Sequence, residues 1–373
     1  MNYILTIFIF ITILFLYIHI ADQYKTSEDL EIYEMDYINN KQFQDVCNIK
    51  QPVLFEFKSI EPTAFRAMTI STIENATKYD INIFDSRDYW KTLDTVDSIT
   101  MPFVAARKLI GTDTNSHFFT EHNETFMDEN GFSKKLNILN TYFKPYGTVQ
   151  TKYDILYGST GTCTPLRYHT DYRHILMVSS GKIHVKMAPW GSSQYLEPIK
   201  DYEKYEFKSP INVWNPQQKY LQEIGKIKFL EFDVFADYAF YIPPYWWYSI
   251  KYTSEDQTSA FTCTYNTIMN CIANIPDIGL YWLQQQNITK KITKMIPAPT
   301  GRDEVKPDNN IIRDESNKQD ATIQIQSMLT DTVATTSIDS LPIYSLPIDS
   351  LPVDDQINND DKTIQNTVAN STL

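Results

Sequence analysis

The sequence predicts a mainly β domain with flanking helices, preceded by one hydrophobic helix and followed by a disordered tail. Three observations lead to this prediction: an uncharged apolar run at the start, short strand-like runs after residue 151, and a low-complexity stretch at the end. Many short strands separated by long insertions are typical of a jelly roll or a barrel. The predicted parts are an anchor at 1–21, a stalk at 22–33, the domain at 34–293 and the tail at 294–373.

The composition is that of a globular protein that does not bind nucleic acid. Of the 373 residues, 42% are hydrophobic and 14% are aromatic, and the formal net charge is −13. Phosphate contacts need clustered Lys and Arg, so this acidic balance argues against nucleic acid as a partner. The cysteines form no CxxC pair and no zinc spacing, so buried thiols are expected. They are Cys47, Cys163, Cys263 and Cys271.

Residues 3–21 predict a membrane-spanning helix. This run has 19 residues without formal charge, Gly or Pro, and about 20 apolar residues in a helix cross a bilayer core. A cleaved signal peptide is disfavoured because the run is long, its start is uncharged and His19-Ile20-Ala21 is a poor cleavage site. We therefore expect a retained single-pass anchor. The flank is acidic, so the side of the membrane on which the domain lies is not predicted.

Four glycosylation sequons would matter only if the domain faces a lumen. They begin at Asn75, Asn123, Asn287 and Asn370.

Within the domain, several strands and helices are expected. In residues 182–187, apolar side chains alternate with Lys and His, which indicates a half-buried strand. A closing helix is expected at 277–292. Further strands are expected at 52–57, 229–234, 239–242 and 261–265, and helices at 43–49 and 133–142.

The tail is acidic and repetitive. Residues 302–373 contain 13 acidic and 5 basic residues, and residues 340–354 repeat SLPIY, SLPID and SLPVD. A Pro at every fifth position excludes a regular helix or a central strand. Disorder is therefore predicted, either as a solvated tail or as a platform for short binding motifs.

Two segments resemble the JmjC-type, cupin-like hydroxylases. Residues 158–190 contain a Gly-rich turn, TPL, a strand that ends in Gly181 and a basic strand; residues 229–250 contain IPPYWW. Family members show T-P-L-H-x-D and, further along, I-P-x-x-W-W-H. The resemblance covers residues 34–290 and implies a double-stranded β-helix, the jelly-roll cupin fold. The chain is also similar to membrane-anchored cupin-like proteins of large DNA viruses and protists, in its TPxRY and YWWYSI segments.

The resemblance implies that the iron site of the family is broken here. Active members hold Fe(II) with two His and one carboxylate and leave positions open for 2-oxoglutarate and oxygen. Alignment on TPL puts Arg167 at the first His and His169 at the carboxylate. Alignment on HxD instead offers His169 and Asp171 as metal ligands, after a two-residue shift. In both alignments Tyr248 replaces the distal His, and no histidine follows His184.

The lysine that commonly binds 2-oxoglutarate in the family is also replaced, by Ile183. The aromatic residues could stack on a flat ligand or simply pack in the core. Arg167 would suit an anionic group, because its fork can donate two hydrogen bonds. The expected ligand pocket comprises Arg167, His169, Ile183, Tyr245, Trp247 and Tyr248, with Arg173 and His174 at its mouth.

Three functions remain open. The first is a membrane-anchored cupin-like domain without catalytic activity or cofactor, which binds a small anionic ligand or a protein partner. The alternative is an Fe(II)/2-oxoglutarate-dependent hydroxylase with His169 and Asp171 as variant metal ligands. In the third, the acidic tail binds partners and the domain is a spacer. Because cupin-like domains often dimerise through C-terminal helices, the helix at 277–292 is a candidate homodimer contact.

Overall fold

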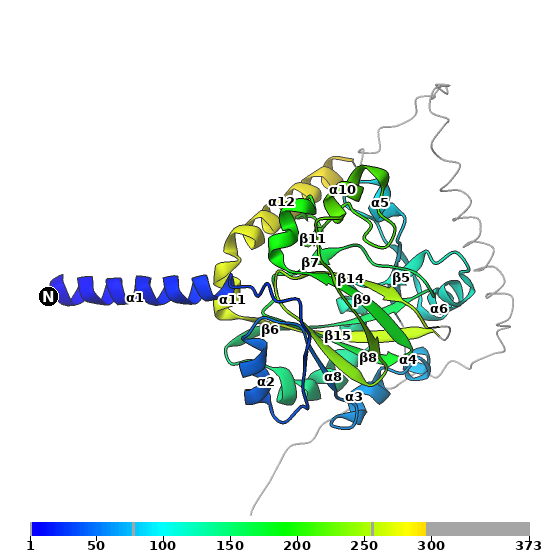
Figure 1. Cartoon of the computed structure of the whole chain (residues 1–373), viewed down its shortest axis with the longest axis horizontal. Helices are drawn as coiled ribbons and strands as arrows, with labels where there is room; N and C mark the ends of the chain where they lie inside the picture. The colour runs from blue at the N-terminus through cyan, green and yellow to red at the C-terminus, as the bar shows by residue number, and fades with distance from the viewer. Residues whose placement is uncertain (1, 77–78, 255–256, 296–373) are drawn as a thin grey trace, which may run out of the picture. The chain divides into compact units, whose positions relative to one another are not determined.

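The computed structural model describes residues 2–76, 79–254 and 257–295, and its strands form two sheets (Figure 1). The tail predicted at 294–373 lies outside the described residues from position 296 onward, as does the sequon at Asn370. Among the strand pairs of these described residues, β1–β2 is parallel and the others are antiparallel.

The larger sheet has nine strands. Their order across the sheet is β1 (Tyr33–Glu34), β2 (Val53–Glu56), β13 (Tyr238–Ile242), β8 (Arg173–Ser180), β15 (Thr258–Thr267), β6 (Thr148–Gly158), β5 (Phe118–Thr120), β3 (Asp80–Asp85) and β4 (Ile99–Pro102). The smaller sheet has six strands. Their order is β10 (Ile199–Asp201), β11 (Glu206–Lys208), β7 (Arg167–Tyr168), β14 (Trp247–Tyr252), β9 (Lys182–Ala188) and β12 (Leu230–Phe235).

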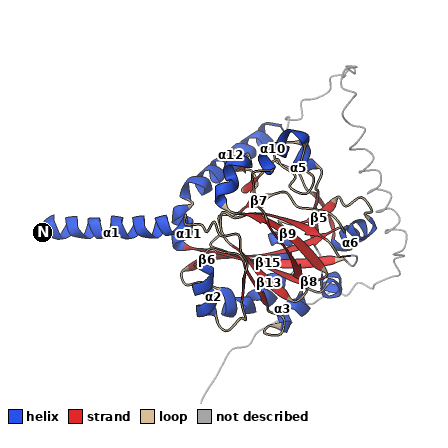
Figure 2. Cartoon of the chain, viewed as in Figure 1, coloured by secondary structure: helices blue, strands red, loops and turns tan. Residues whose placement is uncertain are grey.

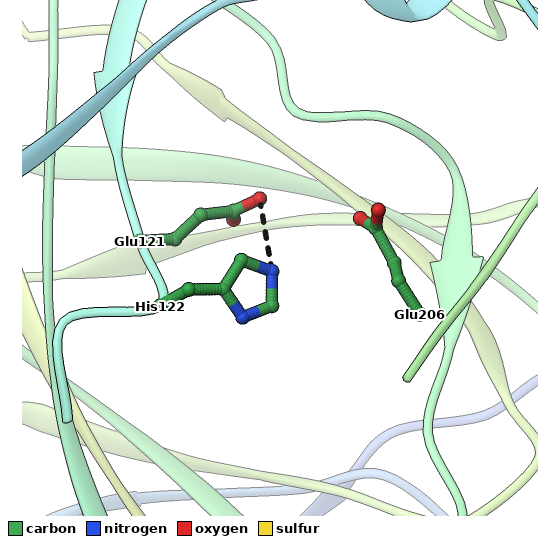
Figure 3. A group of neighbouring side chains, drawn as sticks. All are labelled: Glu121, His122 and Glu206. Atoms are coloured by element: carbon green, nitrogen blue, oxygen red, sulfur yellow. Dashed lines mark ion pairs between the residues drawn. The ribbon is translucent and has the colours of Figure 1, made fainter. Parts of the chain in front are cut away.

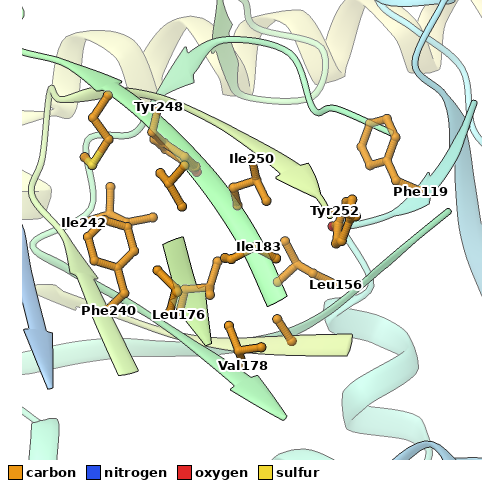
Figure 4. Packing of buried hydrophobic residues seen from close by; sticks show 14 of the residues in the cluster. Phe119, Leu156, Leu176, Val178, Ile183, Phe240, Ile242, Tyr248, Ile250 and Tyr252 are labelled. Atoms are coloured by element: carbon orange, nitrogen blue, oxygen red, sulfur yellow. The ribbon is translucent and has the colours of Figure 1, made fainter. Parts of the chain in front are cut away.

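One hydrophobic core joins the two sheets. Leu176 of β8 and Phe240 of β13 belong to the same buried cluster as Ile183 of β9 and Ile250 of β14 (Figure 4). The sheets are close enough that the ring of Tyr252 lies directly over Gly158, where a Cβ atom would lie only 2.3 Å from the ring. The predicted mainly β domain is therefore confirmed.

The strand predicted from alternation at residues 182–187 is also confirmed. In β9, Ile183, Val185 and Met187 are fully buried in the core. The side chains between them point to the other face, where His184 contacts Asp233 of β12 at 2.6 Å. This face carries an ion-paired surface, while the opposite face forms the core.

Helices flank the sheets (Figure 2). Most precede β6: α2 (Asn40–Cys47), α3 (Pro62–Ala67), α4 (Ile70–Ala76), α5 (Asp88–Lys91), α6 (Phe103–Thr112), α7 (Glu124–Glu129), α8 (Phe132–Leu136), the 3-10 helix η1 (Asn137–Leu139) and α9 (Asn140–Phe143). Between β9 and β12 lie η2 (Trp190–Tyr195), η3 (Gln218–Tyr220) and α10 (Leu221–Ile224), and α11 (Ile268–Ala273) and α12 (Ile275–Met295) follow β15.

The helix predicted at 133–142 is divided into α8, η1 and α9. The side-chain oxygens of Asn137 and Asn140 lie at the breaks and accept hydrogen bonds from Tyr153 at 3.3 Å. Asn favours helix ends because its side chain competes for local hydrogen bonds. The closing helix predicted at 277–292 lies within α12, where Leu280, Trp282 and Leu283 are exposed.

The four cysteines are free. Cys47 and Cys263 are fully buried, as predicted, and burial raises the pKa of the Cys47 thiol to about 12. Cys163 and Cys271 are only partly buried.

The N-terminal apolar run forms α1 (Asn2–Gln23), a helix long and apolar enough to cross a membrane. A signal sequence near an N-terminus has the same length and composition. The segment that follows α1 packs against the domain. The Tyr24 hydroxyl donates to the carbonyl of Ala273 in α11, the Tyr24 ring lies 6.1 Å from that of Tyr245, and Leu30 packs against the core.

Candidate functional site

Two predicted pocket residues, Arg167 and Tyr248, lie opposite each other in neighbouring strands. They are Cα partners in the β7–β14 pair, and Tyr248 is paired on its other side with Met187 of β9. Partners in an antiparallel pair point to the same face of the sheet. Met187 and Tyr248 both belong to the core cluster, so Arg167 also points into the space between the sheets.

Arg167 is buried and its charge is neutralised inside the protein. Both terminal nitrogens of its guanidinium pair with the Glu121 carboxylate, and Nη1 also lies 3.5 Å from Oε1 of Glu206. Burial opposes the positive charge of Arg167, but these carboxylates raise its pKa well above the usual range. Burial alone would raise the pKa of Glu121, whereas the Arg167 charge holds it below the usual range.

Glu121, His122 and Glu206 form a group with metal-ligand chemistry (Figure 3). Among the His, Cys, Asp and Glu residues that the structure describes, only this group brings three possible ligand atoms within 4.8 Å of one another. However, Arg167 pairs with both carboxylates. A cation therefore already lies between these acids, and a second cation would be repelled by it.

His169 and Asp171, the predicted alternative metal ligands, lie side by side. Nδ1 of His169 is 3.7 Å from Oδ2 of Asp171, and the other oxygen of Asp171 accepts a hydrogen bond from Asn266 at 2.8 Å. Both ring nitrogens of His169 are buried, and neither makes a hydrogen bond of good geometry with a described residue. Tyr248 lies near this pair, with its ring centroid 6.0 Å from that of His169.

A second histidine, His174, belongs to the same neighbourhood. Its ring centroid lies 4.7 Å from that of His169, and its Nδ1 is 2.8 Å from the hydroxyl of Thr264. Burial lowers the pKa of both histidines to about 3. Backbone groups of Ile242 and Asp171 only partly oppose this effect at His169. Both rings are therefore neutral at pH 7, the form in which imidazole binds a metal.

The remaining predicted pocket residues are packed rather than open. Ile183 is fully buried in the core. The indole of Trp247 is also fully buried and donates to the hydroxyl of Ser193 at 2.7 Å. Tyr245 donates from its backbone N to the carbonyl of His169 at 2.9 Å, and its hydroxyl contacts Asn274. Arg173, expected at the pocket mouth, is fully buried and hydrogen-bonded to Gln44 and Asn48 of the α2 region.

The donor set does not fit the Fe(II) centre that the resemblance implies. Arg167 cannot bind a metal, because its guanidinium has no lone-pair acceptor and keeps its charge. The pair His169 and Asp171 supplies two donors, and no described His, Cys, Asp or Glu completes a group of three with them within 4.8 Å. A facial triad needs three such donors.

Sequence reasoning missed Glu121 and Glu206, which decide the electrostatics of this site. Glu121 directly follows β5, and Glu206 begins β11. The only sequence signal at Glu121 is an acid placed directly after the apolar run FFT at 118–120. Acids in such positions are usually exposed, so the signal predicts no partner for Arg167.

Comparison with known proteins does not assign the chain to a family. No family model matches the chain, and no curated protein matches it.

Proposed function

We propose that the chain is a membrane-anchored, cupin-like (JmjC-like) protein without catalytic activity, whose domain serves to bind a partner. The observation that carries this proposal is the Arg167–Tyr248 pair. These are the two positions at which the resemblance expects the first and last metal-binding histidines. Their proximity across β7 and β14 agrees with the jelly-roll register that aligns TPL.

The physical argument against an iron centre is one of charge. A guanidinium that is bound to Glu121 and close to Glu206 takes the place that a divalent cation would need. Tyr248 is buried at 6% exposure, and both burial and the nearby Glu121 keep its phenol protonated. A neutral phenol is a poor substitute for imidazole as a ligand.

A protein partner is favoured over a small ligand bound between the two sheets. Ile183 and Tyr248 both pack in the core cluster and fill the interior. The two terminal nitrogens of Arg167 already donate hydrogen bonds to Glu121 and Glu206, so they are not available to bind an anion. Binding is therefore assigned to the outer surface of the domain.

The test is metal binding by the full chain in detergent micelles. We expect no saturable heat when Mn(II), a redox-stable substitute for Fe(II), is titrated by calorimetry with or without 2-oxoglutarate. Tyr248→His should not create a site either, because Arg167 remains. Micromolar binding by the wild type that is lost in His169→Ala would overturn the proposal.

The second candidate is a hydroxylase with a variant metal site. It is favoured by one observation, the 3.7 Å approach of His169 to Asp171 beside a second neutral imidazole, His174. The same titration separates it from the first candidate. It requires binding that disappears in both His169→Ala and Asp171→Asn.

Membrane anchoring by α1 has its own test. We expect the expressed chain to keep residues 1–21 and to stay with the membrane after extraction at alkaline pH. N-terminal sequencing that begins after Ala21 would show instead that the run is a cleaved signal.

A further inference from the structure

The end of the anchor helix is joined directly to the domain. At 1.5 Å per residue, the 22 residues of α1 extend about 33 Å, close to the ~30 Å hydrocarbon thickness of a bilayer. Its last residue, Gln23, is buried, and α1 contacts α11. The next residue, Tyr24, is hydrogen-bonded to Ala273 at the end of α11. The domain residues around α11 therefore lie at the depth where the span ends.

Exposed apolar side chains gather at this depth. Ile268 at the start of α11 is 52% exposed, and Ile275 at the start of α12 is 59% exposed. The backbone N of Ile268 donates to the carbonyl of Gly147 at 3.0 Å, which brings the turn before β6 alongside. In this turn Tyr146 is fully exposed, and Val149 in β6 is 58% exposed.

Ile49 extends the same region from α2. It is 51% exposed and precedes Lys50, which is buried. The carbonyl of Lys50 accepts a hydrogen bond from the indole of Trp246 at 3.1 Å, and the ring of the adjacent Tyr245 lies 6.1 Å from that of Tyr24, which directly follows α1. The end of α2 therefore also lies beside the end of the anchor.

We propose that Ile49, Tyr146, Val149, Ile268 and Ile275, named here the junction patch, insert into the lipid headgroup region of the membrane that α1 spans. This inference rests on the proposed membrane anchoring. It adds that the domain lies on the bilayer surface, whereas the sequence predicted a stalk that separates the two.

A lipid surface is the occupant that the geometry favours. The patch elements lie beside the end of α1, which contacts α11, and the apolar window of α1 is exposed and needs hydrocarbon around it. Aliphatic side chains at the headgroup boundary gain burial, and Tyr is enriched there because its ring is apolar and its hydroxyl is polar. Lys144, two residues before Tyr146 and exposed, can extend towards lipid phosphates.

The experiment uses the full chain in phosphatidylcholine nanodiscs. In a Cys163→Ser/Cys271→Ser background, the remaining cysteines are buried, and single spin labels are placed by Ile268→Cys or Tyr146→Cys. The matched control is Val104→Cys on α6, which is 54% exposed. α6 contacts β5, which pairs with the far end of β6, about 30 Å along that strand from the patch. Oxygen and a water-soluble nickel chelate are then compared as relaxation agents.

We expect the two patch labels to be relaxed several-fold more by oxygen than by nickel, relative to the Val104→Cys control. Equal nickel access at all three positions, with α1 still in the disc, would overturn the inference but leave the anchor intact. Protection that appears only with two chains per disc would assign the patch to a second copy and also overturn it. Failure of the chain to enter discs would reject the anchor, and with it the inference.

Discussion

Arg167 and Tyr248 lie opposite each other in β7 and β14, and the central carbon of the guanidinium is 5.7 Å from the centroid of the phenol ring. A cation over an aromatic face is attracted to it. Glu121 and Glu206 supply the counter-charge. Together these contacts let the interior hold a buried charge, so removal of one partner of the Arg167–Glu121 pair would leave the other without its counter-charge.

Glu121→Gln should destabilise the fold by about 3 kcal/mol. The change leaves Arg167 buried with Glu206 alone at 3.5 Å, and breaking a buried pair typically costs about 3–5 kcal/mol. The measurement is the free energy of unfolding from urea titration of the full chain in detergent. Its control is Glu124→Gln, because Glu124 is about half exposed and pairs with Lys152 at 3.2 Å. That surface pair should contribute less than about 1 kcal/mol, and equal losses in the two variants would contradict the argument.

Replacing both partners should cost less than replacing one. In Arg167→Met/Glu121→Leu, no unpaired Arg remains, and Glu206 keeps its contact with Lys208 at 3.7 Å. Exchange of a buried ion pair for apolar side chains is often neutral or stabilising. The double variant should therefore unfold at higher urea concentration than Glu121→Gln. A double variant that is less stable than Glu121→Gln would indicate that the pair contributes net stability.

Much of the fold was predictable because buried positions recur at regular intervals as apolar residues in the sequence. The two-residue alternation in β9 and the apolar run at β2 identified strands correctly. The breaks at Asn137 and Asn140 were not predicted. Both side chains there accept hydrogen bonds from Tyr153, which only the folded chain brings near them. Likewise, the polar composition of residues 22–33 suggested a stalk, whereas Tyr24 and Leu30 pack against the domain.

Only some residues of the candidate site could be predicted from the sequence. The resemblance to cupin-like proteins pointed to Arg167, His169 and Tyr248, which the structure brings together. Glu121 lies 46 residues before Arg167 and reaches it only through the pairing of β5 with β6. No local pattern encodes such a contact, so the charge balance of the site could be found only from the fold.

Gly158→Ala should destabilise the domain by about 1–3 kcal/mol. The new Cβ would lie 2.3 Å from the ring of Tyr252, which is fully buried and cannot move without disturbing the core. In a Tyr252→Leu background the same change should cost less, and a double-mutant cycle measures this coupling. Gly279→Ala in α12 is the control. No described heavy atom lies within 4 Å of its added methyl, so it should gain up to about 1 kcal/mol from helix propensity. Independent costs at positions 158 and 252 would contradict the close approach of the two sheets.

Stability should fall as the pH drops from 6.5 towards 3, because two partly buried histidines are held in the neutral form. The folded-state pKa values of His169 and His174 are both about 3, below the ordinary value of 6.5. Between pH 3 and 6.5 the unfolded chain binds more protons than the folded chain, so protonation of the histidines favours unfolding. Above pH 6.5 the histidines are neutral in both states and no longer lower the free energy of unfolding. Each histidine contributes up to about 1.4 kcal/mol per pH unit to the slope of the free energy of unfolding against pH. Their ring centroids lie 4.7 Å apart, so the two titrations are coupled. His169→Asn should reduce the slope by up to about 1.4 kcal/mol per pH unit when urea unfolding is followed between pH 4 and 7. Parallel pH profiles for the variant and the wild type would show that His169 is not buried as a neutral ring.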